Sequence, residues 1–86
     1  SRFIKINGIR LSLDDAEKLI ENEFEDLDVI CIGCDDDLVV KYKGKNNLND
    51  DIKNFVCKKI KIHHKHLKVT KINKITRNSS GKKIYN

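Results

Sequence analysis

Thiols and imidazoles are the first groups to consider for chemistry, because both bind zinc in proteins. Two residues separate Cys31 from Cys34, and further along the chain lie His63, His64 and His66. Such side chains can form a zinc site only where they converge as a tetrahedron. If Cys31 and Cys34 belong to one strand, their spacing points the two sulfur atoms to opposite faces of the sheet. A second Cys pair is also missing, and we predict no metal site.

A run of three carboxylates, Asp35, Asp36 and Asp37, follows the second cysteine and could attract a divalent cation. The ligand spacing of a calcium-binding loop does not continue after this run. We therefore interpret the three aspartates as a solvated turn between two strands.

Lysines are densest between residues 58 and 71, where the chain carries Lys58, Lys59, Lys61, Lys65, Lys68 and Lys71. Such a segment can follow a phosphate backbone. It contains none of the aromatic side chains on which single-strand binders stack bases. We interpret it as a solvated or interdomain basic face. A free-standing basic module for nucleic acid remains the alternative function.

The segment from Thr76 to Lys82 combines small polar residues, a glycine and a lysine. Small residues let the backbone approach an anionic group, and the lysine supplies a mobile point charge. The segment is not a Walker loop, which needs two glycines separated by four residues before Lys-Ser/Thr. Taken alone, it fits a surface turn as well as an anion site.

The first element that must position these groups is a hairpin. Two β-rich runs within residues 3–11 flank Asn7 and Gly8, the dipeptide that best tolerates the positive φ angles of a type I′ turn. Ser12 can then cap a helix over residues 13–25. In that segment apolar side chains recur on one face, and carboxylates occupy the first turn.

The remaining elements alternate strand and helix patterns. Residues 29–34 form an apolar run typical of a strand buried on both faces, and residues 38–42 return as a second strand. Asn47 or Asn49 can cap a second helix, whose apolar stripe reaches Ile60 or Ile62. We predict a connector at 63–66, a strand at 67–75, a loop at 77–81 and a truncated helix start at 82–86. This order predicts an α+β fold, a small mixed sheet with an N-terminal β-hairpin and two main helices packed on it.

Length and composition favour a single small domain over residues 1–86, with 38% apolar residues. The longest apolar run, residues 29–34, is too short to span a membrane. The three cysteines cannot all pair, and the N-terminus lacks the apolar region of a secretory signal. We therefore expect reduced thiols and a cytoplasmic location.

The net charge of +5 is unevenly distributed: it is +3 over residues 1–13, −10 over 14–37 and +12 over 38–86. A basic half of this kind suits nucleic acid, a nucleotide cofactor or an acidic neighbouring domain. Charge alone does not choose among these partners.

Two segments near the ends of the chain resemble one enzyme superfamily. The first reads Phe3-Ile4-Lys5-Ile6-Asn7-Gly8-Ile9-Arg10-Leu11, followed by Asp15-Ala16-Glu17. It is similar to the Ile-Lys-x-x-Gly-x-Arg-Ile and Glu-Ile-Glu signature of acyl-adenylating enzymes, among them acyl-CoA synthetases, nonribosomal-peptide adenylation domains and luciferases. The second reads Arg77-Asn78-Ser79-Ser80-Gly81-Lys82 and is similar to that family's Pro-Arg-Thr-x-Ser-Gly-Lys ending. The resemblance is to the family's small C-terminal domain and covers nearly the whole chain.

The resemblance implies a mobile lid of an AMP-forming acid–thiol ligase. Such a ligase makes acyl-AMP from a carboxylic acid and ATP with Mg²⁺. It then transfers the acyl group to CoA or to the phosphopantetheine of an acyl carrier protein. The lid's main partner is its own large N-terminal adenylation domain, which holds ATP and the acid and is absent from these 86 residues. We expect the 86 residues alone to bind no cofactor and to be inactive, and we expect no membrane partner.

The resemblance also implies roles for individual residues. Lys82 is the adenylation lysine, which bridges the attacked carboxylate and the α-phosphate, in a loop where Ser80 and Gly81 let the backbone come close. A second face, used after the lid swings, lines the thiol tunnel with the hairpin residues Lys5, Asn7, Gly8 and Arg10. The hinge falls at Ser1.

Overall fold

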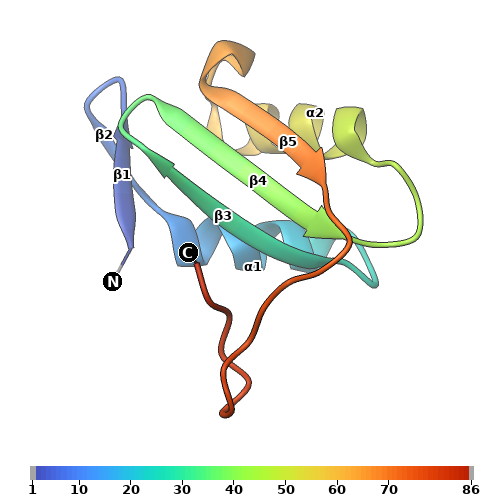
Figure 1. The fold of residues 1–86 in the computed structure, drawn as a ribbon. Helices are drawn as coiled ribbons and strands as arrows, with labels where there is room; N and C mark the ends of the chain where they lie inside the picture. Colours follow the sequence, from blue (N-terminus) through green and yellow to red (C-terminus); the bar gives the residue numbers. More distant parts are fainter. Residues whose placement is uncertain (1, 86) are drawn as a thin grey trace.

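A computed structural model of the chain describes residues 2–85. The elements are, in order, β1 (Phe3–Ile6), β2 (Ile9–Ser12), α1 (Leu13–Glu23), β3 (Asp28–Cys34), β4 (Asp37–Lys43), α2 (Asn49–Ile60), a 3-10 turn η1 (His64–His66) and β5 (Leu67–Lys71). Strands β1 and β2 form a two-stranded hairpin. The other sheet has the order β3-β4-β5, with β3 antiparallel and β5 parallel to β4. Both helices lie on one face of the three-stranded sheet (Figure 1). The predicted α+β fold, with its mixed sheet, N-terminal hairpin and two helices, is confirmed.

Local sequence determines the first third of the fold. Asn7 and Gly8 have φ angles of 51° and 77°, as a type I′ turn requires, and they connect the paired residues Ile6 and Ile9. The Ser12 side chain accepts a hydrogen bond from the backbone N–H of Asp15 at 3.1 Å, so the predicted N-cap of α1 is confirmed.

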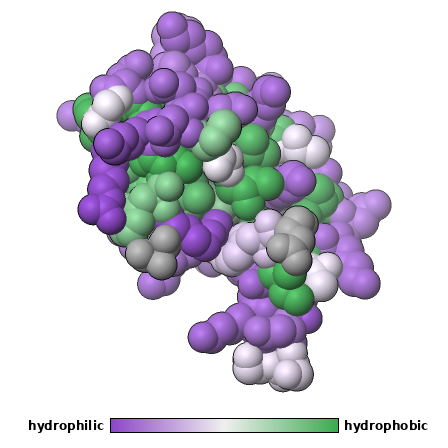
Figure 2. Space-filling view, turned by 60° about the vertical axis from the view of Figure 1, so that its left-hand side comes forward, coloured by the Kyte–Doolittle hydropathy of each residue, from purple (hydrophilic) through white to green (hydrophobic). Residues whose placement is uncertain are grey.

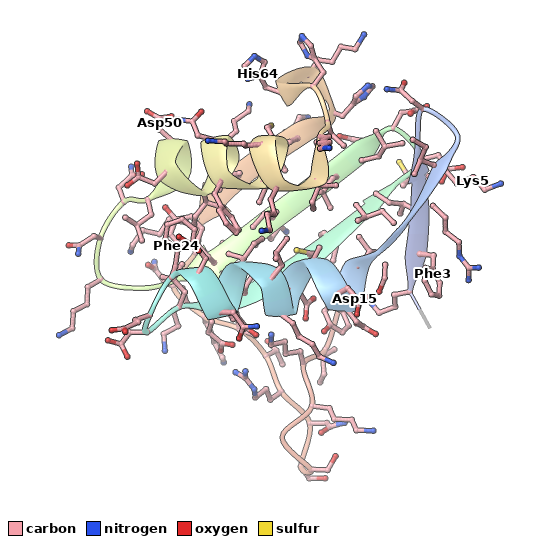
Figure 3. All side chains as sticks on the ribbon, turned by 180° about the vertical axis from the view of Figure 1, so that it is seen from behind. Phe3, Lys5, Asp15, Phe24, Asp50 and His64 are labelled. Atoms are coloured by element: carbon pink, nitrogen blue, oxygen red, sulfur yellow. The ribbon has the colours of Figure 1, made fainter. Side chains whose placement is uncertain are left out.

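The first helix ends at Glu23, two residues before the predicted end. Phe24 is already extended, and its ring packs edge-on against that of Phe55 in α2, with ring centroids 5.6 Å apart. Seen from behind, Phe24 points from the end of α1 toward α2 (Figure 3). This contact between the helices outweighs the helical pattern of the sequence at residues 24–25.

The core lies between the helices and the three-stranded sheet. Its fully buried side chains come from both helices and from the sheet: Ile20, Val29, Cys31, Leu38, Val40, Tyr42, Ile52 and Val56. The buried Tyr42 side chain of β4 also holds the start of the second helix by hydrogen bonds. Its hydroxyl accepts the backbone N–H of Leu48 at 2.7 Å and donates to Asn49 Oδ1 at 2.6 Å.

The predicted N-cap of the second helix, Asn47 or Asn49, was wrong. The N-cap is Leu48, which makes no side-chain capping bond, and the Asn47 side chain accepts the N–H of Asn49 at 3.0 Å. At the other end the helix stops at Ile60 because Lys61 adopts a left-handed φ of 62°. Ile62 therefore lies beyond the helix, and its N–H closes the end by donating to the Cys57 carbonyl at 3.2 Å.

The C-terminal segment differs most from the prediction. Strand β5 ends at Lys71, four residues early, after which the Ile72 N–H donates to the Tyr42 carbonyl at 2.7 Å and the chain leaves the sheet. The predicted helix start at 82–86 is wrong for residues 82–85, which are not helical. They return antiparallel to residues 76–78 through a bridge between Arg77 and Lys83 and a hydrogen bond from Ile84 to Thr76. This narrow loop extends from the body of the molecule and turns back toward α1 (Figure 1).

Candidate functional site

The loop that carries Lys82 is closed by one asparagine side chain. Asn78 Oδ1 accepts the backbone N–H groups of Ser80 and Lys82, each at 3.0 Å, and the Ser80 hydroxyl at 2.8 Å. Gly81 has a φ of 85°, and a Cβ atom there would meet nothing within 4 Å. The role of Asn78 was not predicted, although an Asn that accepts an N–H two residues later is a common turn signal.

Two consecutive lysines in this loop have opposite environments. Lys82 is exposed, and its ammonium makes no hydrogen bond or ion pair within residues 2–85. The Lys83 side chain is 14% exposed and reaches back to the body of the molecule. Its Nζ donates to the Val29 carbonyl at 2.6 Å, to Glu21 Oε2 at 2.9 Å and to Glu17 Oε1 at 3.3 Å. Lys82 is therefore available to a group outside the chain, whereas Lys83 is bound within it.

The charge of Lys83 is stabilised where it lies. Burial disfavours the ammonium, but hydrogen bonds and the negative charges of Glu21 and Glu17 outweigh that effect, so the pKa of Lys83 is raised. The pKa of the Tyr85 phenol is raised as well, by burial and by its 3.0 Å hydrogen bond to Glu17 Oε1.

A second interaction, an ion pair, holds the first half of the loop, which leaves the sheet. The Arg77 guanidinium donates to both carboxylate oxygens of Asp28, at 2.5 and 2.7 Å. This bidentate pair lowers the pKa of Asp28, although partial burial of the carboxyl opposes the shift. The loop is thus connected to β3 through Asp28 and to α1 through Lys83.

An open cleft of about 580 Å³ lies between α1 and the loop. Its lining mixes cationic and anionic side chains with the backbone of the turn: Arg2, Asp14, Glu17, Lys18, Glu21, Arg77, Gly81, Lys82, Lys83 and Tyr85. Gly81 and Lys82, both singled out from the sequence, belong to this lining, and Ser80 lies at the tip beside them. The cleft brings the predicted lysine next to an acidic helix face.

The other predicted residues lie on the hairpin. Gly8 is at its tip, where a Cβ atom would meet nothing within 4 Å. Lys5 and Arg10 are paired across the two strands, and the Arg10 guanidinium stacks on the Phe3 ring, 3.8 Å from its centroid. The Lys5 side chain points away from the body of the molecule (Figure 3).

The acidic turn between β3 and β4 holds this hairpin in place. Asp35 Oδ1 accepts the backbone N–H of Lys5 at 2.8 Å, and Asp36 Oδ1 accepts that of Asn7 at 2.7 Å. The Asp36 N–H in turn donates to the Lys5 carbonyl at 2.7 Å. Asp35 and Asp36 form the turn, whereas Asp37, also predicted there, is the first residue of β4 and pairs with Cys34. Asp35 and Asp36 bind the backbone of the hairpin instead of being only solvated.

A small groove of about 80 Å³ runs beside the hairpin, between β2 and the end of α2. Its walls include Ile6, Ile9 and Ile62, with Arg10 and Lys61 among the polar lining. Phe3 and Ile9 are the large apolar side chains most exposed in the described part of the chain, at 42% and 73%. Figure 2, with this side turned forward, shows hydrophobic residues gathered in one area and framed by hydrophilic ones.

The hairpin tip and the Lys82 loop lie at separate places on the molecule, the first beside the β3–β4 turn and the second projecting past α1 and the β3 edge of the sheet (Figure 1). The structure therefore groups the predicted residues into two sites. The hinge assigned to Ser1 falls outside the described residues.

The Cys and His residues do not converge. Cys31 is buried and Cys34 is exposed, as expected for opposite faces of a strand. Burial and the nearby Glu17 charge raise the pKa of the Cys31 thiol to about 12, so it packs as a neutral side chain. Within residues 2–85, no group of three or more His, Cys, Asp or Glu side chains could hold a metal ion.

Comparison of the chain with protein-family models, with curated proteins and with solved structures finds no match. Neither helix between residues 2 and 85 combines the length and the apolar character needed to cross a membrane.

Proposed function

We propose that this chain is the mobile C-terminal lid of an AMP-forming, acyl-CoA synthetase-like ligase. The observation that carries the proposal is the contrast between neighbouring lysines: Lys83 is bound to α1 and β3, while Lys82 extends from a glycine turn with an exposed ammonium. A lysine held this way can enter the active site of another domain. Its position in the Arg77–Lys82 motif is that of the family's adenylation lysine.

The chemistry of Lys82 suits the first half-reaction. A carboxylate that attacks the α-phosphate of ATP brings two anions together, and a compact ammonium between them lowers their repulsion and stabilises the developing charge. Ser80 and Gly81 carry little bulk at the tip, and no atom crowds the Cβ position of Gly81. The loop can therefore approach a phosphate closely.

The hairpin suits the second half-reaction. Gly8 leaves open space at the tip, and Asn7 keeps the turn tight. A larger loop here would obstruct the path of the thiol. Lys5 and Arg10 are positive charges on the strands beside it. In the swung state these residues line the path by which a thiol of CoA or of a carrier-protein phosphopantetheine reaches the acyl-AMP.

This proposal requires an ATP-binding domain joined before residue 1, in a cytoplasmic enzyme that uses a carboxylic acid, ATP with Mg²⁺ and a thiol. The chain itself supplies Lys82 and the hairpin. The residues encoded directly before Ser1 give the simplest check, since a Gly-Arg at the family's spacing behind a large domain is expected there.

The decisive experiment measures the two half-reactions separately in the enzyme that joins both domains. In Lys82→Ala, ATP–pyrophosphate exchange should fall by about a hundred- to a thousandfold, the usual effect of losing one preorganised charge contact. Attack of the thiol on synthetic acyl-AMP should stay near the wild-type rate. Lys74→Ala, which removes another exposed lysine from the same tail, is the control. Wild-type pyrophosphate exchange in Lys82→Ala would overturn the proposal.

The basic face supports a second candidate, a nucleic-acid-binding module. Five of its lysines, Lys58, Lys59, Lys61, Lys65 and Lys68, are exposed on the end of α2, the η1 turn and β5. A phosphate-backbone binder retains DNA or RNA at low salt and loses it with a steep logarithmic salt dependence. No retention at low salt would exclude this candidate, whereas steep salt-dependent binding would favour it over the lid.

A further inference from the structure

The carboxylate of Glu17 is the most connected polar group around the cleft. Its side chain is 7% exposed, and each of its oxygens accepts two hydrogen bonds. Oε2 takes the Cys31 N–H at 2.9 Å and Arg2 Nη1 at 3.1 Å. Oε1 takes the Tyr85 hydroxyl at 3.0 Å and Lys83 Nζ at 3.3 Å. Its acceptor capacity is thus fully used by four donors from three parts of the chain: the N-terminal segment, β3 and the C-terminal segment.

These contacts also close the free edge of the sheet. Strand β3 is an edge strand, and the outward N–H and C=O groups of Val29 and Cys31 have no strand beside them. Side chains replace the missing strand: Glu21 and Glu17 accept the two N–H groups, at 3.0 and 2.9 Å. Lys83 and Arg2 donate to the two carbonyls. An edge covered in this way offers no template for pairing with another chain.

Glu17 thereby joins the two ends of the chain. Arg2 comes directly after the proposed hinge position, and Lys83 comes directly after the proposed adenylation lysine. The Arg2 guanidinium also lies over the Tyr85 ring, 3.4 Å from its centroid. The residues that flank the hinge and Lys82 are therefore held by one buried carboxylate.

We propose that Glu17 is a positioning residue for Lys82: it fixes the Lys82 loop to the segment after the hinge, so that rotation about the hinge moves both as one body. This inference rests on the proposed function. Without the carboxylate, Lys83 and Tyr85 lose their shared acceptor, and Arg2 and the Cys31 N–H lose theirs. Lys83 would keep its bonds to Glu21 and to the Val29 carbonyl, and Arg77 its pair with Asp28, but the acceptor that Lys83 and Tyr85 share with Arg2 would be gone.

The test compares Glu17→Gln with Glu23→Gln, the same change at an exposed position of the same helix. In the Glu17→Gln variant one oxygen becomes an NH₂ group that faces hydrogen-bond donors, because all four partners of Glu17 donate. In the enzyme that joins both domains, we expect kcat for pyrophosphate exchange to fall by about a hundredfold, as misplacing a reacting group by about 1 Å does. KM for ATP and the thiol half-reaction should change little, and Glu23→Gln should resemble wild type.

A purely structural role for Glu17 predicts a different pattern. The positioning role would be overturned if Glu17→Gln lowered thermal stability and slowed both half-reactions equally, or lowered stability without slowing adenylation. In either case, a loss of adenylation in Lys82→Ala would leave the proposed function standing. An undamaged Lys82→Ala enzyme would instead reject the proposed function, and with it this inference.

A second pair of variants covers the case in which Glu17→Gln does not fold. Lys83→Met removes the charged link from the loop to Glu17 and Glu21 but leaves Glu17 bound to Arg2, to the Cys31 N–H and to the Tyr85 hydroxyl, and Lys83→Arg restores a charged donor. We expect Lys83→Met to lose adenylation selectively and Lys83→Arg to recover part of it. Equal adenylation in Lys83→Met and wild type would also overturn the inference.

Discussion

The hairpin tip at Gly8 and the loop tip at Gly81 are alike locally and different in what holds them. Both glycines have positive φ angles, 77° and 85°, with open space at the Cβ position. The hairpin is rooted in the core by Ile4 and Ile6, which are 5% and 4% exposed. The Gly81 loop is held mainly by ion pairs, from Arg77 to Asp28 and from Lys83 to the acidic face of α1. The hairpin site is thus fixed by apolar packing together with the Asp35 and Asp36 hydrogen bonds, and the loop site mainly by ion pairs.

A bulky side chain at the hairpin tip should produce the largest difference between the hairpin and the Lys82 loop. Gly8→Leu should slow thiol attack on acyl-AMP by about a hundredfold, because the side chain would fill the thiol path and misplace the reacting group. Pyrophosphate exchange should be retained, which is the reverse of the expected effect of Lys82→Ala. Gly8→Asn is the control for backbone strain, since Asn tolerates a positive φ. Equal damage to both half-reactions by Gly8→Leu would mean that one surface serves both steps.

Removing the apolar root of the hairpin should produce the next largest effect. Ile6→Ala deletes a buried side chain, and we expect it to lower the free energy of unfolding by about 2–5 kcal/mol in urea denaturation. Ile9→Ala, on the neighbouring strand, removes a side chain that is 73% exposed and should change stability by less than about 0.5 kcal/mol. Similar values for the two variants would contradict the view that the hairpin is fixed by the core.

The same contrast explains which features could be predicted from the sequence. The Asn7-Gly8 turn and the Ser12 cap depend on residues close to one another in the chain, so their types alone specified them. The start of α2 depends on the Tyr42 hydroxyl, and the hairpin depends on the Asp35 and Asp36 carboxylates. These partners belong to other elements of the fold, so no local sequence pattern predicts the contacts.

The candidate site divides in the same way. The sequence predicted a loop at 77–81 followed by a lysine, and the structure has an exposed turn there. The Lys83–Glu17 contact spans 66 positions, so sequence spacing could not reveal it. The extended path of residues 82–85 follows from that contact and from pairing with residues 76–78, which is why a local helix prediction failed there.

Because ion pairs and hydrogen bonds hold the loop, alkaline pH should loosen it. The folded pKa of Tyr85 is raised above its ordinary value of 10.0, so the Tyr85 contribution is fully present below pH 10 and is lost as pH rises through the folded pKa. The stability difference between wild type and Tyr85→Phe should therefore be constant below pH 10 and shrink above it. Urea denaturation of both proteins from pH 8 upward measures this. A difference that stays constant or grows above pH 10 would contradict the assignment.

The smallest expected effect comes from the exposed Arg77–Asp28 pair. The folded pKa of Asp28 lies below its ordinary value of 3.8, so the pair stabilises the loop above that pH and is lost as pH falls through the folded pKa. A carboxyl NMR titration should give Asp28 a lower pKa in wild type than in Arg77→Ala. If Asp28 titrates alike in wild type and Arg77→Ala, the guanidinium does not hold the loop in solution, and the contacts of Lys83 and Tyr85 with α1 and β3 carry its attachment.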